Sequence, residues 1–143
     1  MNTERIKKEL GEGAVFDIGA ENMAFSQYFQ GQSYLNMLTT EGVVIGNVTF
    51  EPGCRNNWHI HHAENGGGQI LLCIAGRGYY QEWGKEAKKL HQGDVVMIPA
   101  EVKHWHGAAA DSWFAHLAVE VPGEKTGNEW CEPVSDEEYG KLK

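Results

Sequence analysis

Short segments of apolar and alternating residues follow one another along most of the chain. Their length and their β-branched and aromatic content predict strands. The expected strands cover residues 28–40, 41–50, 56–61, 69–76, 78–83, 95–99 and 113–121. Turn formers such as the EPG triplet at 51–53 separate them. Six or more strands at short intervals, with hardly any helix between them, predict an antiparallel sandwich or barrel.

Two finer features accompany this pattern. Only a short turn separates the apolar run 69–76 from the next strand at 78–83, so we expect these two strands to form a hairpin. Short helices are expected at both ends of the chain. Residues 3–10 have an amphipathic pattern, and Ser135 and Glu138 have the S-x-x-E form of a capping box.

The composition agrees with a single β-rich domain over residues 1–143. A chain of 143 residues has the usual size of one domain, and eighteen glycines against four prolines supply many turns. Three cysteines, Cys54, Cys73 and Cys131, are an odd number without CxxC spacing. This pattern favours reduced thiols over disulfides or a thiolate metal site.

The charge of the chain argues against two classes of partner. Twenty acidic residues against twelve Lys and Arg give a formal net charge of −8, which repels phosphate backbones and anionic membrane surfaces. We therefore expect neither a nucleic acid nor a membrane as partner. The N-terminal residues lack the apolar core of a secretory signal, and no apolar run approaches the roughly 20 residues that span a bilayer. A soluble, cytoplasmic protein that acts on a small molecule is the expectation.

Five of the seven histidines lie in three segments whose alternation, if extended, brings their side chains together: 59–61, 104–106 and the strand that carries His116. His59 and His61 are two residues apart in an extended segment, so both side chains leave the same face. His104 and His106 have the same relation, and His116 follows on a later strand. A lone strand histidine is more often a surface or hydrogen-bonded core residue. Paired imidazoles that converge on one point indicate a metal site.

The residues around these pairs resemble the two motifs of the cupin family. Segment 53–61 fills the first motif, G-x5-H-x-H, and segment 93–104 fills the second, G-x5-P-x-G-x2-H, with Glu101 where glycine is usual. The resemblance implies an all-β fold, the double-stranded β-helix or jelly-roll barrel, with short terminal helices. It also implies a barrel core at about 44–120, an N-terminal arm at 1–40 and a C-terminal tail at 121–143.

The same resemblance implies one metal ion held by four side chains, three of them the motif histidines His59, His61 and His104. The fourth is usually a glutamate. Counting back over six residues from Gly76 places it at Gln69, whereas counting forward from His61 leaves Glu64 too early. We take Gln69 as the fourth ligand because the residues before it are typical of an enlarged turn. Glu64 is the alternative.

This ligand set indicates which metal to expect. Three imidazoles and an amide oxygen suit manganese, iron, nickel, cobalt or zinc, and the absence of a thiolate argues against a structural zinc site. We expect one divalent ion, manganese or iron. Neutral ligands leave the full dipositive charge facing the substrate, which favours a Lewis-acid role.

More of the chain is similar to the small bacterial cupins that include manganese-dependent hydroxynitrile lyases. The similarity rests on Gln69 and on segments 48–53, 58–61, 93–96, 103–108, 116–120 and 130–139. The enlarged turn at 62–68 and Asn56 depart from that pattern. The resemblance implies that His106 and His116 are acid/base groups beside the metal, where a neutral imidazole is a ready base. The alternative is that they only hydrogen-bond a ligand or a backbone carbonyl.

Two residues near the histidines are expected to be structural. Cys73 has the same strand phase as Gln69 and is predicted to be a buried, inert thiol. Trp105 lies between His104 and His106, so its side chain is predicted to point away from them. We expect it to pack against an opposing sheet or another subunit.

These features favour a lyase that breaks a bond to carbon in a small organic substrate. Cyanohydrin cleavage is the concrete case, and decarboxylation or isomerisation of a hydroxy acid or lactone uses the same groups. An iron-dependent oxygenase and a non-catalytic cupin that anchors a ligand on its metal are the alternatives, because this fold hosts all three. The strand at 28–40 is able to cover a sheet edge in its own subunit or in another, and we expect a homodimer or larger oligomer.

Overall fold

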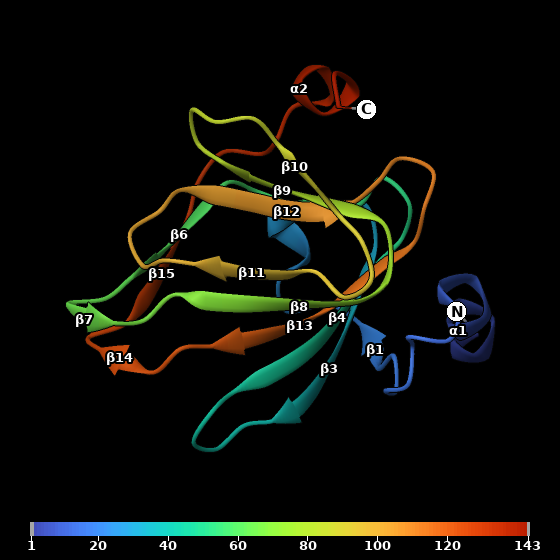
Figure 1. Ribbon diagram of the computed structural model, residues 1–143, viewed down its shortest axis with the longest axis horizontal. Helices are drawn as coiled ribbons and strands as arrows, with labels where there is room; N and C mark the ends of the chain where they lie inside the picture. Colours follow the sequence, from blue (N-terminus) through green and yellow to red (C-terminus); the bar gives the residue numbers. More distant parts are fainter. Residues whose placement is uncertain (1, 143) are drawn as a thin grey trace.

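Two antiparallel sheets face each other in the computed structural model, which describes residues 2–142 (Figure 1). The first sheet contains, in spatial order, β1 (Ala20–Glu21), β3 (Ser33–Thr39), β4 (Ile45–Phe50), β13 (Phe114–Glu120), β8 (Gln69–Gly76) and β11 (Val95–Ile98). The second contains β10 (Lys88–Leu90), β9 (Gly78–Glu82), β12 (His104–Ala108), β5 (Arg55–Asn56) and β2 (Phe29–Gln30). It is extended by β6 (His59–His62), which pairs with β12 and with β15 (Gly127–Trp130).

The remaining elements are short. β7 (Asn65–Gly66) pairs with β14 (Gly123–Glu124), and a 3-10 helix η1 covers Ser26–Tyr28. Helix α1 spans Thr3–Leu10, and α2 spans Asp136–Gly140 behind the capping box of Ser135 and Glu138. The predicted all-β barrel with short terminal helices is therefore confirmed.

The predicted hairpin of 69–76 with 78–83 is wrong. β8 pairs with β11 and β13, whereas β9 pairs with β10 and β12, so the two strands belong to different sheets. The chain changes sheet at Gly76, which has a φ of 74° and lies against the backbone of Trp113. A glycine at the end of a strand signals a sharp change of direction, but it does not specify which strand becomes the neighbour.

The segment 28–40 is paired within its own chain. β2 joins β5 and β3 joins β4, so both parts of the segment complete the two sheets. β15 in the C-terminal tail likewise pairs with β6. The N-terminal arm and the tail thus contribute strands to the barrel, while the homodimer or larger oligomer stays a prediction.

The interior between the sheets is apolar at one end. Its buried residues are Phe50, Cys54, Leu71, Cys73, Tyr80, Leu90, Ile98, Ala108 and Phe114. Burial raises the pKa of the Cys73 thiol to about 12, so the thiol stays protonated, as predicted for an inert cysteine.

The terminal helices cover the outer faces of the two sheets. α1 packs Ile6 and Leu10 against the first sheet, and the C-terminal segment packs Tyr139 against the second. Trp105 points to this outer face, and its ring centroid lies 6.1 Å from that of Tyr139. The expected partner of Trp105, an opposing sheet or another subunit, is therefore corrected to the chain's own tail. Within residues 2–142 no helix is long and apolar enough to cross a membrane.

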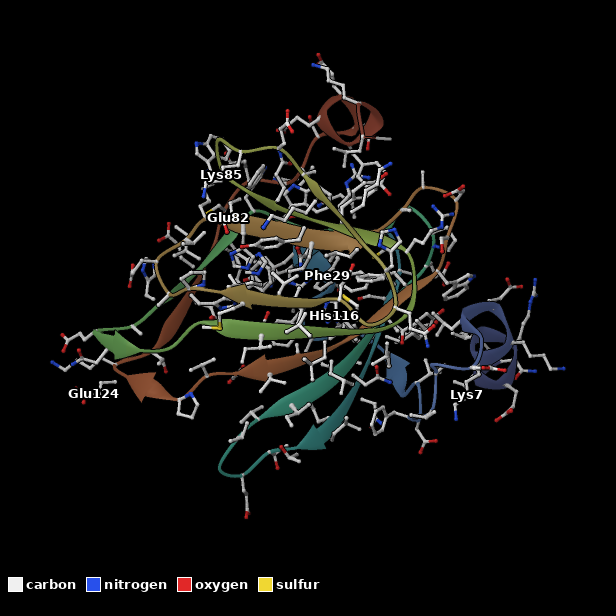
Figure 2. The ribbon with its side chains drawn as sticks, viewed as in Figure 1. Lys7, Phe29, Glu82, Lys85, His116 and Glu124 are labelled. Atoms are coloured by element: carbon white, nitrogen blue, oxygen red, sulfur yellow. The ribbon has the colours of Figure 1, made fainter. Side chains whose placement is uncertain are left out.

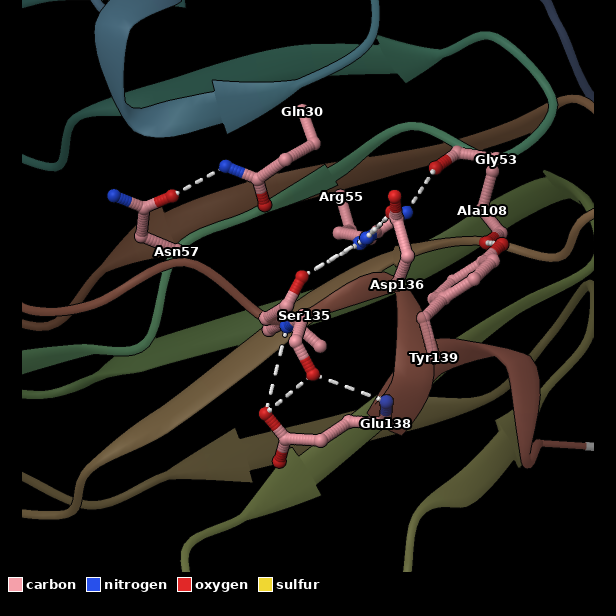
Figure 3. A network of polar contacts seen from close by, with 10 residues as sticks. Gln30, Gly53, Arg55, Asn57, Ala108, Ser135, Asp136, Glu138 and Tyr139 are labelled. Carbon is pink, nitrogen blue, oxygen red and sulfur yellow. Dashed lines mark hydrogen bonds and ion pairs between the residues drawn. The ribbon is translucent and has the colours of Figure 1, made fainter.

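Arg55 ties this tail to the barrel (Figure 3). Its Nη2 donates to the carbonyl oxygen of Val134 at 2.9 Å and pairs with Asp136 Oδ1 at 2.7 Å, and its guanidinium lies 4.3 Å from the ring centre of Tyr139. The Tyr139 hydroxyl donates to the carbonyl oxygen of Ala108. These contacts join strands β5 and β12, which both carry residues of the site, to the C-terminal helix.

The packing of Gly76, where the chain passes from one sheet to the other, can be tested by its effect on stability. An alanine at Gly84 meets no atom within 4 Å, so Gly84→Ala should cost only the left-handed backbone conformation, about 1–2 kcal/mol. A Cβ at Gly76 would lie 1.8 Å from the Trp113 carbonyl oxygen. We expect Gly76→Ala to lower the free energy of unfolding by about 3–4 kcal/mol, measured in urea. Equal losses in the two variants would contradict this packing.

Candidate metal centre

The five histidines singled out by their spacing converge between the two sheets. β6 and β12 pair directly at His59 and His104, whose ring centroids are 4.1 Å apart. The His61 ring lies 5.2 Å from His59 and 5.1 Å from His104. β13 brings His116 from the opposite sheet to 4.8 Å from His106, and Figure 2 shows His116 in the space between the sheets.

Each of the three motif histidines has one ring nitrogen already occupied. In His59 and His104, Nδ1 lies 2.7 Å and 2.8 Å, respectively, from the backbone carbonyl oxygen two residues earlier. In His61, Nδ1 lies 2.7 Å from Asn128 Oδ1. Carbonyl oxygens only accept hydrogen bonds, so Nδ1 carries the proton in each ring and Nε2 keeps its lone pair.

These lone pairs fit a metal ion. Among the described residues, His61 Nε2 and His104 Nε2 are buried without a hydrogen-bond partner. A buried polar atom left unpaired costs about 1–3 kcal/mol. Ligand nitrogens of His59, His104 and His106 lie within 4.8 Å of one another, close enough to hold an ion. Imidazole donors suit divalent transition metals, so the residues present fit such a group.

His61 and His106 compete for the third position. The His106 ring lies 5.6 Å from His59 and 5.9 Å from His104, farther than His61 lies from either. His106 Nδ1 also has a partner, His116 Nε2, at 3.0 Å. The unpaired Nε2 favours His61 as a ligand, and the four-ligand set predicted from the motifs stays a prediction.

Gln69 and Glu64 occupy different environments. Gln69 begins β8 and lines the same cavity as His59 and His61. Glu64 is exposed, and its carboxylate lies 3.3 Å from Lys125 Nζ. This placement favours Gln69 over Glu64 as the fourth ligand.

His106 and His116 form a buried pair beside the three motif histidines. Asn56 contacts the pair from β5: its Oδ1 accepts from the backbone N–H of His106 at 2.9 Å, and its Nδ2 lies 3.3 Å from His106 Nε2. Phe50 lies under both rings, with centroids 6.1 Å from His106 and 5.3 Å from His116. The pair is therefore shielded from water and its orientation is fixed.

A cavity of about 160 Å³ opens beside the histidines. Its lining is mainly apolar, with several polar groups among which are four of the five histidines. The residues are Asn22, Phe25, Phe29, Leu35, Met37, Val44, Gly46, Val48, Asn56, His59, His61, Gln69, His106, His116, Ala118, Glu120, Asn128 and Trp130. Concave apolar sites with a few convergent polar groups are typical of small-molecule binding.

Three of the lining residues that sequence reasoning did not assign to the site bear on its geometry or its charge. Asn128 holds His61, Trp130 lies 4.7 Å from the His59 ring, and Glu120 is the carboxylate in the cavity lining. Asn128 and Trp130 are two residues apart, which in a strand places both side chains on the same face. The sequence of this segment, however, gave little indication of a strand.

Burial keeps the histidines neutral. It lowers the pKa of His104 to about 4 and of His116 to about 3. Burial, and then the neighbouring histidines, also place the pKa values of His59 and His106 well below 6.5. All four rings are therefore electron-pair donors at neutral pH.

These shifts predict that the metal-free protein is sensitive to acid. An unfolded histidine has a pKa of about 6.5, so below that pH the unfolded chain binds protons that the buried rings do not, and stability falls. Each such ring contributes about 1.4 kcal/mol per pH unit. Urea unfolding between pH 7 and 5 should show this loss. In His116→Gln the free energy of unfolding should change less steeply with pH, because about one proton fewer is taken up on unfolding.

One exposed histidine acts in the opposite direction. Glu129 and Glu101 raise the pKa of His62, so its contribution is present at low pH and is lost as the pH rises. A metal-free protein equally stable at pH 7 and pH 5 would contradict the dominance of the buried rings.

Comparison with known proteins places the chain in a family. Residues 46–120 match the cupin domain model. Over 92 residues, 64% of this chain and 67% of the relative, it is 42% identical to a protein from Granulicella tundricola named (R)-mandelonitrile lyase. A cupin-like protein from Thermotoga maritima is 39% identical, with a TM-score of 0.77 over 89% of this chain and 95% of that chain.

A more distant structure shares the fold alone. The DMSP lyase DddQ from Ruegeria pomeroyi is 20% identical, with a TM-score of 0.59 over 80% of this chain and 57% of that chain. The family model spans more than half of the 143 residues, and it includes β6 and β12, which carry the histidines of the candidate metal centre. The chain therefore belongs to the cupin family.

Proposed function

We propose that this cupin is a divalent-metal-dependent lyase that cleaves small, uncharged cyanohydrins to a carbonyl compound and hydrogen cyanide. The observation that carries the proposal is a buried, neutral His106–His116 pair, 3.0 Å between nitrogens, beside the three motif histidines, two of which have a buried Nε2 without a hydrogen-bond partner in the described chain. The name of the Granulicella tundricola relative supports the same reaction.

The metal would be held by His59, His61, Gln69 and His104, with manganese or iron as the preferred ion. A bound divalent ion supplies a Lewis acid that makes the substrate hydroxyl easier to deprotonate. The hydrogen bonds on Nδ1 of the three histidines orient their rings and raise the basicity of Nε2.

The neutral His106 ring then serves as the base. It accepts the hydroxyl proton of the cyanohydrin while the bond between the carbinol carbon and the nitrile carbon breaks. The bonding electron pair leaves with cyanide, and the former hydroxyl oxygen forms the carbonyl group. Returning the proton to cyanide gives hydrogen cyanide and restores the neutral ring, and His116 at 3.0 Å shares the charge during the transfer.

The cavity favours an uncharged substrate. Among its lining residues, all within the described part of the chain, there is no Lys or Arg, and Glu120 is the charged member. A carboxylate or phosphate substrate therefore has no cationic side chain to pair with in the lining and meets the like charge of Glu120, so the proposed metal ion alone would attract it. The volume of about 160 Å³ is close to that of an engineered cavity of about 150 Å³ that binds benzene. These features favour a cyanohydrin with an apolar body over a hydroxy acid.

The ligand assignment can be tested by metal content. Gln69→Ala should weaken manganese binding by about 10–100-fold, and Glu64→Ala, its matched control, should bind like the native chain. His59→Ala should lose the metal. Elemental analysis and chelator competition give these values. Loss in Glu64→Ala with full binding in Gln69→Ala would reverse the assignment.

The reaction can be tested with mandelonitrile as substrate. The manganese-loaded protein should release benzaldehyde and cyanide, and the metal-free protein should not. His106→Ala and His116→Ala should lower kcat by about 10²–10⁴-fold while retaining the metal, because each removes a proton-transfer group. Mandelate, the matched hydroxy acid, should not be decarboxylated.

Other outcomes separate the alternatives. Loss of metal in His106→Ala would make His106 a ligand and refute its acid/base role. Iron-dependent oxygen uptake would favour an oxygenase. Full metal loading without turnover of any cyanohydrin would favour a non-catalytic, ligand-binding cupin.

A further inference from the structure

We infer that Asn128 is a positioning residue of the metal centre: it fixes the orientation and tautomer of His61 from a strand outside the segment matched by the cupin model. β15 (Gly127–Trp130) follows the matched residues 46–120. The inference rests on the metal site in the proposed function, but not on the reaction performed there.

The first step is the contact itself. His61 Nδ1 lies 2.7 Å from Asn128 Oδ1. An amide oxygen has no proton to donate, so the hydrogen of the neutral ring must be on Nδ1. The lone pair is then on Nε2, which is buried and without a hydrogen-bond partner in the described chain. Without this acceptor, the ring is free to adopt the tautomer protonated at Nε2, which cannot bind a metal through that atom.

The second step is the difference between His61 and the other motif histidines. His59 and His104 are held by backbone carbonyls two residues earlier in their own segments. His61 instead depends on a side chain 67 residues away. Of the three hydrogen bonds to Nδ1, the one to His61 is therefore the one that a side-chain substitution can remove without altering the backbone.

The third step is that β15 is itself held in place. In its ladder with β6, Asn128 stands opposite His61 and Trp130 stands opposite His59. Trp130 stacks on Tyr28, with ring centroids 4.4 Å apart and planes at 2°. On the other face of β15, Glu129 Oε1 lies 2.8 Å from His62 Nε2. The Asn128 amide is thus presented by a strand fixed on both faces.

The experiment compares Asn128→Ala, Asn128→Asp and a control, Asn65→Ala. Asn65 lies on the neighbouring β7, is exposed, and pairs with Glu124 rather than with a histidine. Manganese affinity, measured by chelator competition, should fall by about 10–100-fold in Asn128→Ala and stay native in Asn65→Ala. Asn128→Asp should retain affinity, because a carboxylate accepts the same hydrogen bond.

A second readout does not need the metal. Nitrogen NMR of the metal-free protein should show His61 protonated at Nδ1 in the native chain and in Asn128→Asp, and a mixture of tautomers in Asn128→Ala. Native affinity together with an unchanged His61 tautomer in Asn128→Ala would overturn the inference. A native chain that binds no manganese would overturn the metal centre itself, and with it this role.

Discussion

The structure depends on one constraint: several imidazoles must remain neutral inside an apolar barrel. Charging a buried ring is costly, and a buried polar nitrogen without a partner is costly as well. The fold reduces the second cost, because Nδ1 of His59, His61 and His104 has an oxygen acceptor within 2.8 Å. What remains in the described chain are the lone pairs of His61 Nε2 and His104 Nε2, which are buried without a hydrogen-bond partner. Protonation would satisfy them only by placing like charges together, so a cation is the partner that removes the penalty.

The rest of the barrel keeps this site dry and fixed. Phe50 and the apolar core lie beneath the histidine pair, and the two sheets place the candidate ligands of β6 and β12 opposite His116 on β13. The ends of the chain complete the enclosure. Trp130 from the tail stacks on Tyr28 from the N-terminal arm, and the two rings form a wall beside His59. The low pKa values of the buried histidines are consequences of this enclosure, because burial is the first cause of each shift.

The sequence was most informative where the physics is local. Alternation of apolar residues located the strands, and the i, i+2 spacing of the histidines placed them on common faces, because both depend only on strand geometry. Prediction from the sequence failed where two residues or strands in contact lie far apart along the chain. The glycine at position 76 marked a sharp turn, but the strands on either side of it pair with β13 and β12, which both come much later in the chain. Asn128 could not be assigned to the site because its partner is 67 residues away, and the partner of Trp105 proved to be the tail.

These long-range contacts also show that the segment matched by the cupin model is not the whole of the site. The matched segment 46–120 carries the metal-site residues and the His106–His116 pair. Asn128 and Trp130, which support two of the histidines, lie beyond it. Residues 46–120 alone therefore do not determine the surroundings of the histidines in this chain, because these two contacts come from the tail. The charge of the cavity lining, in contrast, comes from the matched segment, because Glu120, the last residue of β13, is the charged member of the lining and no Lys or Arg among the described residues balances it there.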